Sequence, residues 1–119
     1  VADTVREPDG LALSSRNRYL SGAERVAAVV LFRALGHAGT LFDAGERDGD
    51  SLRAAVRTVL AGEPAGMPDY VSLADPDDLR ELDRVSVTPA LLSLAVRFGN
   101  TRLLDNLILR PPPAPAPPA

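Results

Sequence analysis

The sequence has no cysteine, no lysine and no tryptophan, and its one histidine is His37. The absence of cysteine excludes disulfides, a thiolate nucleophile and cysteine-based metal sites. The absence of lysine excludes Schiff-base chemistry, so any phosphate group must be bound by arginine, hydroxyls or backbone amides. A single histidine excludes an all-histidine metal cluster, and its place in a predicted helix indicates a surface or partly packed side chain.

A strong excess of charge and long apolar runs are also missing. Thirteen arginines stand against 16 acidic residues, which gives a net charge of −3. Such a balance provides no long-range attraction toward nucleic acid or anionic membranes. No apolar run approaches the roughly 20 residues needed to span a bilayer, and no signal-peptide pattern is present. We therefore expect no nucleic-acid partner, no membrane partner and a cytoplasmic location.

Length and composition predict one domain and a tail. Of the 119 residues, 111–119 are only proline and alanine, which is typical of a solvated, polyproline-like, disordered extension. Residues 1–110 suffice for one domain with a modest core. Because the chain opens on Val1 and reaches its most distinctive motif almost at once, we expect it to be the C-terminal part of a longer protein.

The first predicted helix has clear start and stop signals. Ser21-Gly22-Ala23-Glu24 has the form of a capping box, in which Ser21 and Glu24 each bond to the other's backbone amide. An ensuing apolar stripe at helical spacing comprises Leu31, Leu35, Ala38 and Phe42. Gly45 is the predicted stop.

The remaining elements predict an α+β fold. A second helix is expected from a cap at 49–51 to near Gly62, with an apolar stripe of Leu52, Val56, Val59 and Leu60. Strands are expected at 70–73, 90–98 and 102–109, the last two forming a hairpin across 99–101 or a close neighbour pairing. Residues 75–78 are expected to start a turn of helix that carries Leu79 and Leu82. We predict two main helices packed on a small, about three-stranded antiparallel sheet.

The segment ahead of the first helix holds the residues best suited to binding phosphate. Asp9-Gly10 is a turn signal, and Ser14-Ser15-Arg16 places two hydroxyls beside one guanidinium. Such donors can neutralise the charge that develops on a triphosphate or on departing pyrophosphate. The pattern alone leaves open a plain polar loop that precedes a capped helix.

Four ordered segments resemble the pantothenate synthetase (pantoate-beta-alanine ligase) family. The nearly unbroken phrase from Val5 to Leu20, VREPDGLALSSRNRYL, is similar to the family's nucleotide loop. Residues 44–48, 69–71 and 102–106 resemble further family segments in the expected order. The resemblance covers most of residues 3–110, and it identifies the chain with the C-terminal lid domain of that family.

The resemblance implies a ligase of coenzyme A biosynthesis. The implied enzyme activates pantoate with ATP and Mg²⁺ as pantoyl adenylate, which beta-alanine then attacks to give pantothenate. Val5 and Leu13 would border the adenosine, whereas Ser14, Ser15 and Arg16 would contact the phosphates, with Arg16 as the catalytic residue. The family's N-terminal Rossmann-like domain, with its acid pocket, is missing here, so we expect negligible turnover from this chain alone. The parent is expected to be a homodimer.

Two alternatives and several supporting roles follow from the same residues. The chain is alternatively a non-catalytic module that self-associates through a former interface, or part of an adenylate-forming ligase for another acid. Arg6, Glu7 and Asp9 are expected to hold the loop through local bonds. Arg102 and Asp105 are expected to form an ion pair or a turn lock, and residues 47–48 a solvated turn.

Overall fold

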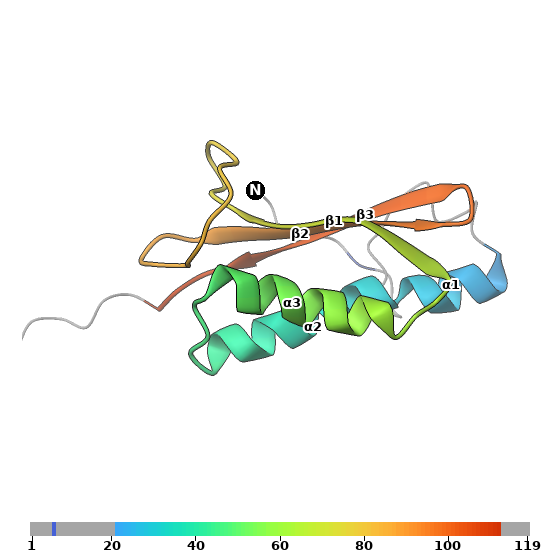
Figure 1. Ribbon diagram of the computed structural model, residues 1–119, viewed down its shortest axis with the longest axis horizontal. Coiled ribbons are helices and arrows are strands. Elements are labelled where there is room, and N and C mark those ends of the chain that lie inside the picture. The colour runs from blue at the N-terminus through green and yellow to red at the C-terminus, as the bar shows by residue number, and fades with distance from the viewer. Residues whose placement is uncertain (1–5, 7–20, 113–119) are drawn as a thin grey trace, which may run out of the picture.

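The protein folds into a layer of helices against one sheet. The structure is a computed structural model that describes residue 6 and residues 21–112. Within these residues the elements are α1 (Gly22–Ala28), α2 (Val30–Asp43), α3 (Gly49–Ala61), β1 (Gly66–Ala74), β2 (Ala90–Phe98) and β3 (Thr101–Leu109). The helices α2 and α3 run in opposite directions under one face of the sheet (Figure 1). The predicted fold class is confirmed.

Local signals at both ends of the first helical run are confirmed. The Ser21 hydroxyl accepts from the Glu24 amide, and the Glu24 carboxylate accepts from the Ser21 amide, at 3.1 and 3.0 Å. Helix α2 ends before Gly45, whose φ of +114° is the left-handed conformation that glycine tolerates. The predicted single helix is divided at Val29, although this residue keeps helical angles of −61° and −18°.

The second helix begins differently from the prediction. Its N-cap is Asp48, whose carboxylate accepts from the Ser51 amide at 2.9 Å. Asp48 is exposed, as expected of a solvated turn, but Arg47 departs from that expectation. Arg47 is half-buried, with its guanidinium 4.0 Å from the centroid of the Phe42 ring and a 2.6 Å bond to the Phe42 carbonyl oxygen. This turn locks the end of α2 to the start of α3.

The cap at Asp48 predicts a specific loss of stability in acid. Hydrogen bonds from the Ser51 backbone and hydroxyl hold the pKa of Asp48 below its ordinary value of 3.8. Because the folded state releases this proton more readily, the contribution is present above pH 3.8 and is lost as pH falls through the lowered pKa. Asp48→Asn keeps a capping side chain but removes the titrating carboxylate. We therefore expect the melting temperature of this variant to depend less on pH below about pH 4, where an ordinary aspartate carboxyl is protonated. An unchanged acid slope in calorimetric scans would contradict this role.

The sheet is antiparallel in the order β1-β2-β3. Strands β2 and β3 form the predicted hairpin, with Phe98 opposite Thr101 and Ala90 opposite Leu109. β1 is longer than the predicted strand at 70–73, and its register shifts between Pro68 and Tyr70. This bulge leaves Asp69 without a cross-strand partner in the ladder.

The core lies between the sheet and the helices. Every second residue of β2 points toward α2 and α3, as strand geometry requires. The largest fully buried side chains are Phe98, Leu31, Leu35, Leu52, Leu73, Leu92, Leu94, Val56, Val85 and Val96. The predicted helical stripes lie in this core, with Val59 only half-buried at its margin.

Residues 75–79 form a single helical turn as predicted, closed by a 2.9 Å bond from the Leu79 amide to the Asp75 carbonyl oxygen, but the turn ends before Leu82, which was expected to lie on it. The Asp75 carboxylate accepts from the amides of Asp77 and Asp78, and the Asp75 amide donates to the Arg80 carbonyl. Leu79 has a φ of +61°, which a helix cannot continue, and it is exposed. Glu81 then accepts from the Ser72 hydroxyl and the Leu73 amide, at 2.7 and 2.9 Å, tying this segment to β1.

The helical run Glu24–Asp43 has the length and apolar composition of a membrane span. However, 44% of its most apolar window is buried inside the fold. Its buried side chains contact α3 and the sheet, as in the core helix of a globular domain. Length and composition are therefore weak evidence for a membrane span here.

Two glycines, one in the β2–β3 turn and one inside α2, make a matched test of the backbone conformation at the turn. Gly99, in the β2–β3 turn, has a φ of +60°, and an added Cβ would lie 2.6 Å from the Glu24 carboxylate. Gly36 is an exposed residue inside α2 with nothing within 4 Å of an added Cβ. We expect Gly99→Ala to lower the free energy of unfolding by about 1–2 kcal/mol, and Gly36→Ala to raise it by about 0.5–1 kcal/mol. Urea unfolding measures both, and equal effects would contradict the assigned turn.

Candidate functional site

The predicted site lies in a segment whose two flanks are described. Val5, Leu13, Ser14, Ser15 and Arg16 all lie outside the described residues, as do Glu7 and Asp9. Arg6 lies directly before residues 7–20, which include Leu13 to Arg16, and Ser21 directly follows them. The contacts of these two flanking residues are the structural information that bears on the site.

Arg6 is joined to β3 by a two-pronged ion pair. Its Nη1 atom lies 2.6 Å from Oδ2 of Asp105, and its Nη2 atom lies 3.0 Å from Oδ1. The Asp105 side chain is 1% exposed and that of Arg6 is 20% exposed. Oδ1 also accepts from the Asn106 amide at 2.8 Å. Both carboxylate oxygens are therefore satisfied in a buried position, as a buried charge requires.

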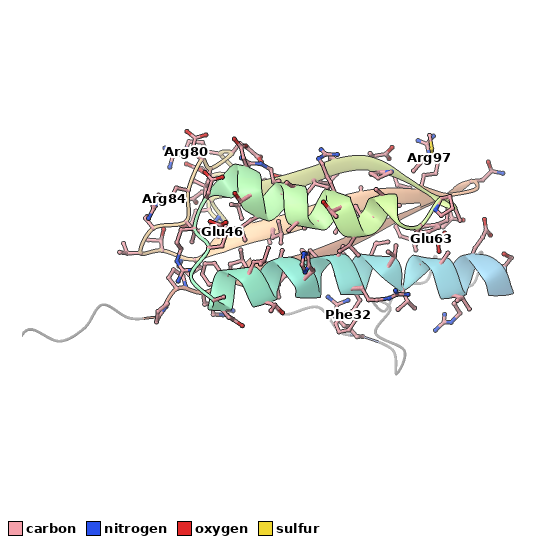
Figure 2. The ribbon with its side chains drawn as sticks, turned by 60° about the horizontal axis from the view of Figure 1, so that its bottom comes forward. Phe32, Glu46, Glu63, Arg80, Arg84 and Arg97 are labelled. Atoms are coloured by element: carbon pink, nitrogen blue, oxygen red, sulfur yellow. The ribbon has the colours of Figure 1, made fainter. Side chains whose placement is uncertain are left out.

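The same guanidinium contacts helix α2. The Arg6 Cζ atom lies 4.7 Å from the centroid of the Phe32 ring, within the range of a cation–π contact. Phe32 projects from α2 on the side away from α3 (Figure 2). Arg6 thus bridges β3 and α2, which are distant partners that the expectation of local bonds did not include.

The other flank meets the β2–β3 turn. Ser21 and Glu24 form the capping box of α1, and the close approach of Glu24 to Gly99 brings this cap against the turn. The turn and α1 lie at the same end of the molecule (Figure 1). Both flanks of residues 7–20 therefore rest on the β2–β3 hairpin.

Arg102 and Asp105 do not pair with each other as expected. Alternation along β3 puts them on different faces of the sheet, and Arg102 Nε instead bonds Oδ2 of Asp69 at 2.8 Å. The bulge in β1 frees Asp69 for this contact, and Arg97 Nη2 lies 3.9 Å from the same oxygen. The Arg102 guanidinium also lies 5.7 Å from the centroid of the Tyr70 ring. Two of the family-like segments, 69–71 and 102–106, thus meet across the sheet.

A shallow cavity of about 320 Å³ lies at the opposite end of the sheet from Ser21. It is lined by Asp75, Pro76, Asp77, Thr88, Pro89, Ile108 and Arg110. Its place near the end of β3 separates it from the turn at Gly99. We assign it no role in the candidate site.

The described residues offer no obvious metal centre. Among residue 6 and residues 21–112, no group of three or more histidine or acidic side chains could hold a metal ion. His37 is exposed on α2, as predicted. We therefore assign no Mg²⁺ ligand to this part of the chain.

Sequence reasoning missed the Arg6–Asp105 pair, although one signal was present. Alternation along β3 puts Asp105 on the same face as the buried Leu103 and Leu109. A carboxylate among apolar neighbours on a core-facing row requires a charged partner. Its partner lies 99 residues away, and no local pattern identifies it.

The family model described as pantoate-beta-alanine ligase matches residues 1–108. The chain is 64% identical over 109 residues to the pantothenate synthetase of Roseiflexus castenholzii, and 61% identical to that of Chloroflexus aurantiacus. Each alignment covers 92% of this chain but only 39% of the relative. The chain therefore spans about two fifths of the length of these relatives.

Solved structures show the same fold. The pantothenate synthetase of Thermus thermophilus superposes with a TM-score of 0.84 at 39% identity, over 91% of this chain and 38% of that one. The pantoate-beta-alanine ligase of Francisella tularensis, solved with beta-gamma ATP and beta-alanine, gives 0.51 at 21% identity over 93% and 33%, a likeness of fold alone. The match over residues 1–108 places the chain in the pantoate-beta-alanine ligase family.

Proposed function

We propose that residues 1–110 are the C-terminal lid domain of a cytoplasmic pantothenate synthetase of coenzyme A biosynthesis, with residues 111–119 a solvated tail. The observation that carries this proposal is the match of residues 1–108 to the family, at 61–64% identity to relatives named pantothenate synthetase. The alignments leave three fifths of those relatives unmatched. A preceding Rossmann-like domain would hold the acid pocket and, by family analogy, most of the dimer contact.

In the proposed reaction the carboxylate of pantoate attacks the α-phosphorus of ATP and displaces pyrophosphate. The amine of beta-alanine then attacks the acyl carbon of pantoyl adenylate, releasing AMP and forming the amide of pantothenate. Ser14, Ser15 and Arg16 would bind the phosphates, where hydroxyls and a guanidinium offset the charge of the departing pyrophosphate. Val5 and Leu13 would border the adenosine, and Mg²⁺ would enter with the ATP phosphates.

The contacts of the residues that flank this segment support the proposed role. Both flanks rest on the β2–β3 hairpin, whose buried face forms much of the core. A lid of this kind would exclude water from the reactive adenylate when it closes over the preceding domain.

A chimera tests the proposal directly. Residues 1–108 of this chain would replace the matching C-terminal segment of the Chloroflexus aurantiacus pantothenate synthetase. We expect formation of pantothenate that depends on ATP, pantoate and beta-alanine, and no turnover by the 119-residue chain alone. A chimera that folds like its parent but makes no pantothenate would refute the proposed function.

The rival proposal of a self-associating module makes a different prediction. If the isolated chain associates through its former interface, its mass in light scattering should rise with concentration. A constant monomeric mass over the same concentration range would refute self-association, and the lid-domain proposal would then have no rival from this test.

A further inference from the structure

The shallow cavity at the end of the sheet carries charges of both signs. Residues 75–77 and 88–89 line it from the loop between β1 and β2, and Ile108 and Arg110 line it from the end of β3. All of these residues belong to the described part of the chain. The loop and the β2–β3 turn lie at opposite ends of the molecule (Figure 1). The cavity is therefore separate from the candidate site, and a ligand in it would not depend on the proposed function.

Two carboxylates line the loop side of the cavity, those of Asp75 and Asp77. Oδ1 of Asp75 accepts from the amides of Asp77 and Asp78 at 2.8 and 3.3 Å, which holds this carboxylate in place. Because these bonds use only Oδ1, the Oδ2 atom of Asp75 is able to accept from a ligand. Asp77 is exposed, so its carboxylate can also reach into the cavity. Two such carboxylates attract an ammonium group through charge-assisted hydrogen bonds.

A guanidinium lines the other side of the cavity, from Arg110. Ala74 pairs with Leu91, which in turn pairs with Ile108, so the ends of β1 and β3 lie on either side of β2. Two strand spacings, about 10 Å, thus separate the backbones at Asp75 and Arg110. A guanidinium binds a carboxylate through two parallel hydrogen bonds. The cavity therefore offers a position for an anionic group across from a position for a cationic one.

The rest of the lining is largely apolar, since Pro76, Pro89 and Ile108 contribute to it together with Thr88. Proline rings lose no side-chain rotamer freedom when a ligand packs against them. The volume of about 320 Å³ lies at the lower end of the range for small-molecule sites. The cavity thus suits a small ligand with methylene groups between its charged ends.

A ligand of one charge matches this lining less well. A simple anion would be attracted by Arg110 but repelled by the carboxylates of Asp75 and Asp77, and a simple cation would be repelled by the guanidinium. A zwitterion with its two charges well separated places each charge beside a group of the opposite sign.

We propose that this cavity binds a long-chain ω-amino acid such as 6-aminohexanoate. The ammonium of the ligand lies at Asp75 and Asp77, and its carboxylate pairs with Arg110. The methylene chain packs on the two proline rings and Ile108.

The test is an amide NMR titration of the 119-residue chain with 6-aminohexanoate, hexanoate and hexylammonium, which share a carbon chain and differ in charge. With 6-aminohexanoate we expect saturable shifts at Asp77, Thr88 and Arg110 and a Kd of about 1–10 mM, because exposed ion pairs contribute little each. The two single-charge probes should bind about three- to fivefold more weakly, since each loses one ion pair. Absence of saturable shifts with 6-aminohexanoate, or equal affinity for a single-charge probe, would overturn the proposal.

Beta-alanine tests the separation of the two charges. Its chain is too short to reach both sides of the cavity at once, so we expect its affinity to be about three- to fivefold lower than that of 6-aminohexanoate. Equal affinity would contradict the proposed preference for a long chain.

Two variants test the charged groups and leave the turn at Asp75 intact. Arg110→Gln and Asp77→Asn should each weaken binding of 6-aminohexanoate about three- to fivefold. Arg57→Gln and Asp83→Asn are the matched controls, because they remove the same charges from exposed positions outside the lining, and they should leave the Kd unchanged. All four positions are exposed, so the variants should melt like the wild type. An unchanged Kd in both cavity variants would show that the ligand does not bind there.

Discussion

Replacing Arg16 with alanine in the active chimera should lower the single-turnover rate of pantoyl adenylate formation about 100- to 1000-fold. The proposed guanidinium neutralises charge that grows on the leaving pyrophosphate, so its loss acts on the transition state more than on bound ATP. The rate of the second step, attack by beta-alanine on preformed adenylate, should change far less. Rapid-quench measurement of each step separates the two effects.

Arg18→Ala is the matched control for this prediction. It removes the same charge two residues further along the same segment, at a position for which we propose no phosphate contact. We expect its adenylation rate to remain within a few-fold of the wild type. An unchanged rate of adenylate formation in Arg16→Ala would remove Arg16 from the site.

Replacing Phe98 with alanine should lower the free energy of unfolding of the 119-residue chain by about 3–5 kcal/mol. Phe98 is fully buried at the end of β2, and an added Cβ on Gly66 would lie only 3.1 Å from its ring. A cavity there has rigid strand neighbours that can collapse only partly, so most of the cost remains. The loss is a large share of the about 5–15 kcal/mol typical of a domain.

Val87→Ala is the control for the loss at Phe98. Val87 is 82% exposed, so removal of its two methyl groups should change stability by no more than about 0.5 kcal/mol. Urea unfolding of both variants gives the comparison. Similar midpoints for the two would mean that the β2 face is not the core.

The sequence was informative wherever a structure depends on neighbouring residues. The Ser21–Glu24 capping box, the stop at Gly45 and the hairpin at 99–101 each rest on contacts within a few residues, and each is confirmed. The apolar stripes likewise predicted which helical faces are buried, because burial follows the helical period.

Contacts between distant residues were not predictable in the same way. Arg102 was expected to pair with Asp105, but a bulge in β1 brings Asp69 to it instead. The predicted turn of helix after residue 75 is a single turn that stops short of Leu82, because Leu79 adopts a left-handed conformation. The fold class and the cap of the first helix were thus predictable from the sequence, whereas the Arg6–Asp105 ion pair required the structure.

The roles of Val5, Leu13, Ser14, Ser15 and Arg16 still rest on the family resemblance. The most direct test is amide NMR on a chimera isotopically labelled only in this chain, titrated with a non-hydrolysable ATP analogue whose binding is followed in parallel by calorimetry. We predict saturable shifts at Val5 and from Leu13 to Arg16, with the midpoint that calorimetry gives. If calorimetry shows saturation but the chemical shifts of those amides do not change, the claim that this segment binds the nucleotide is contradicted.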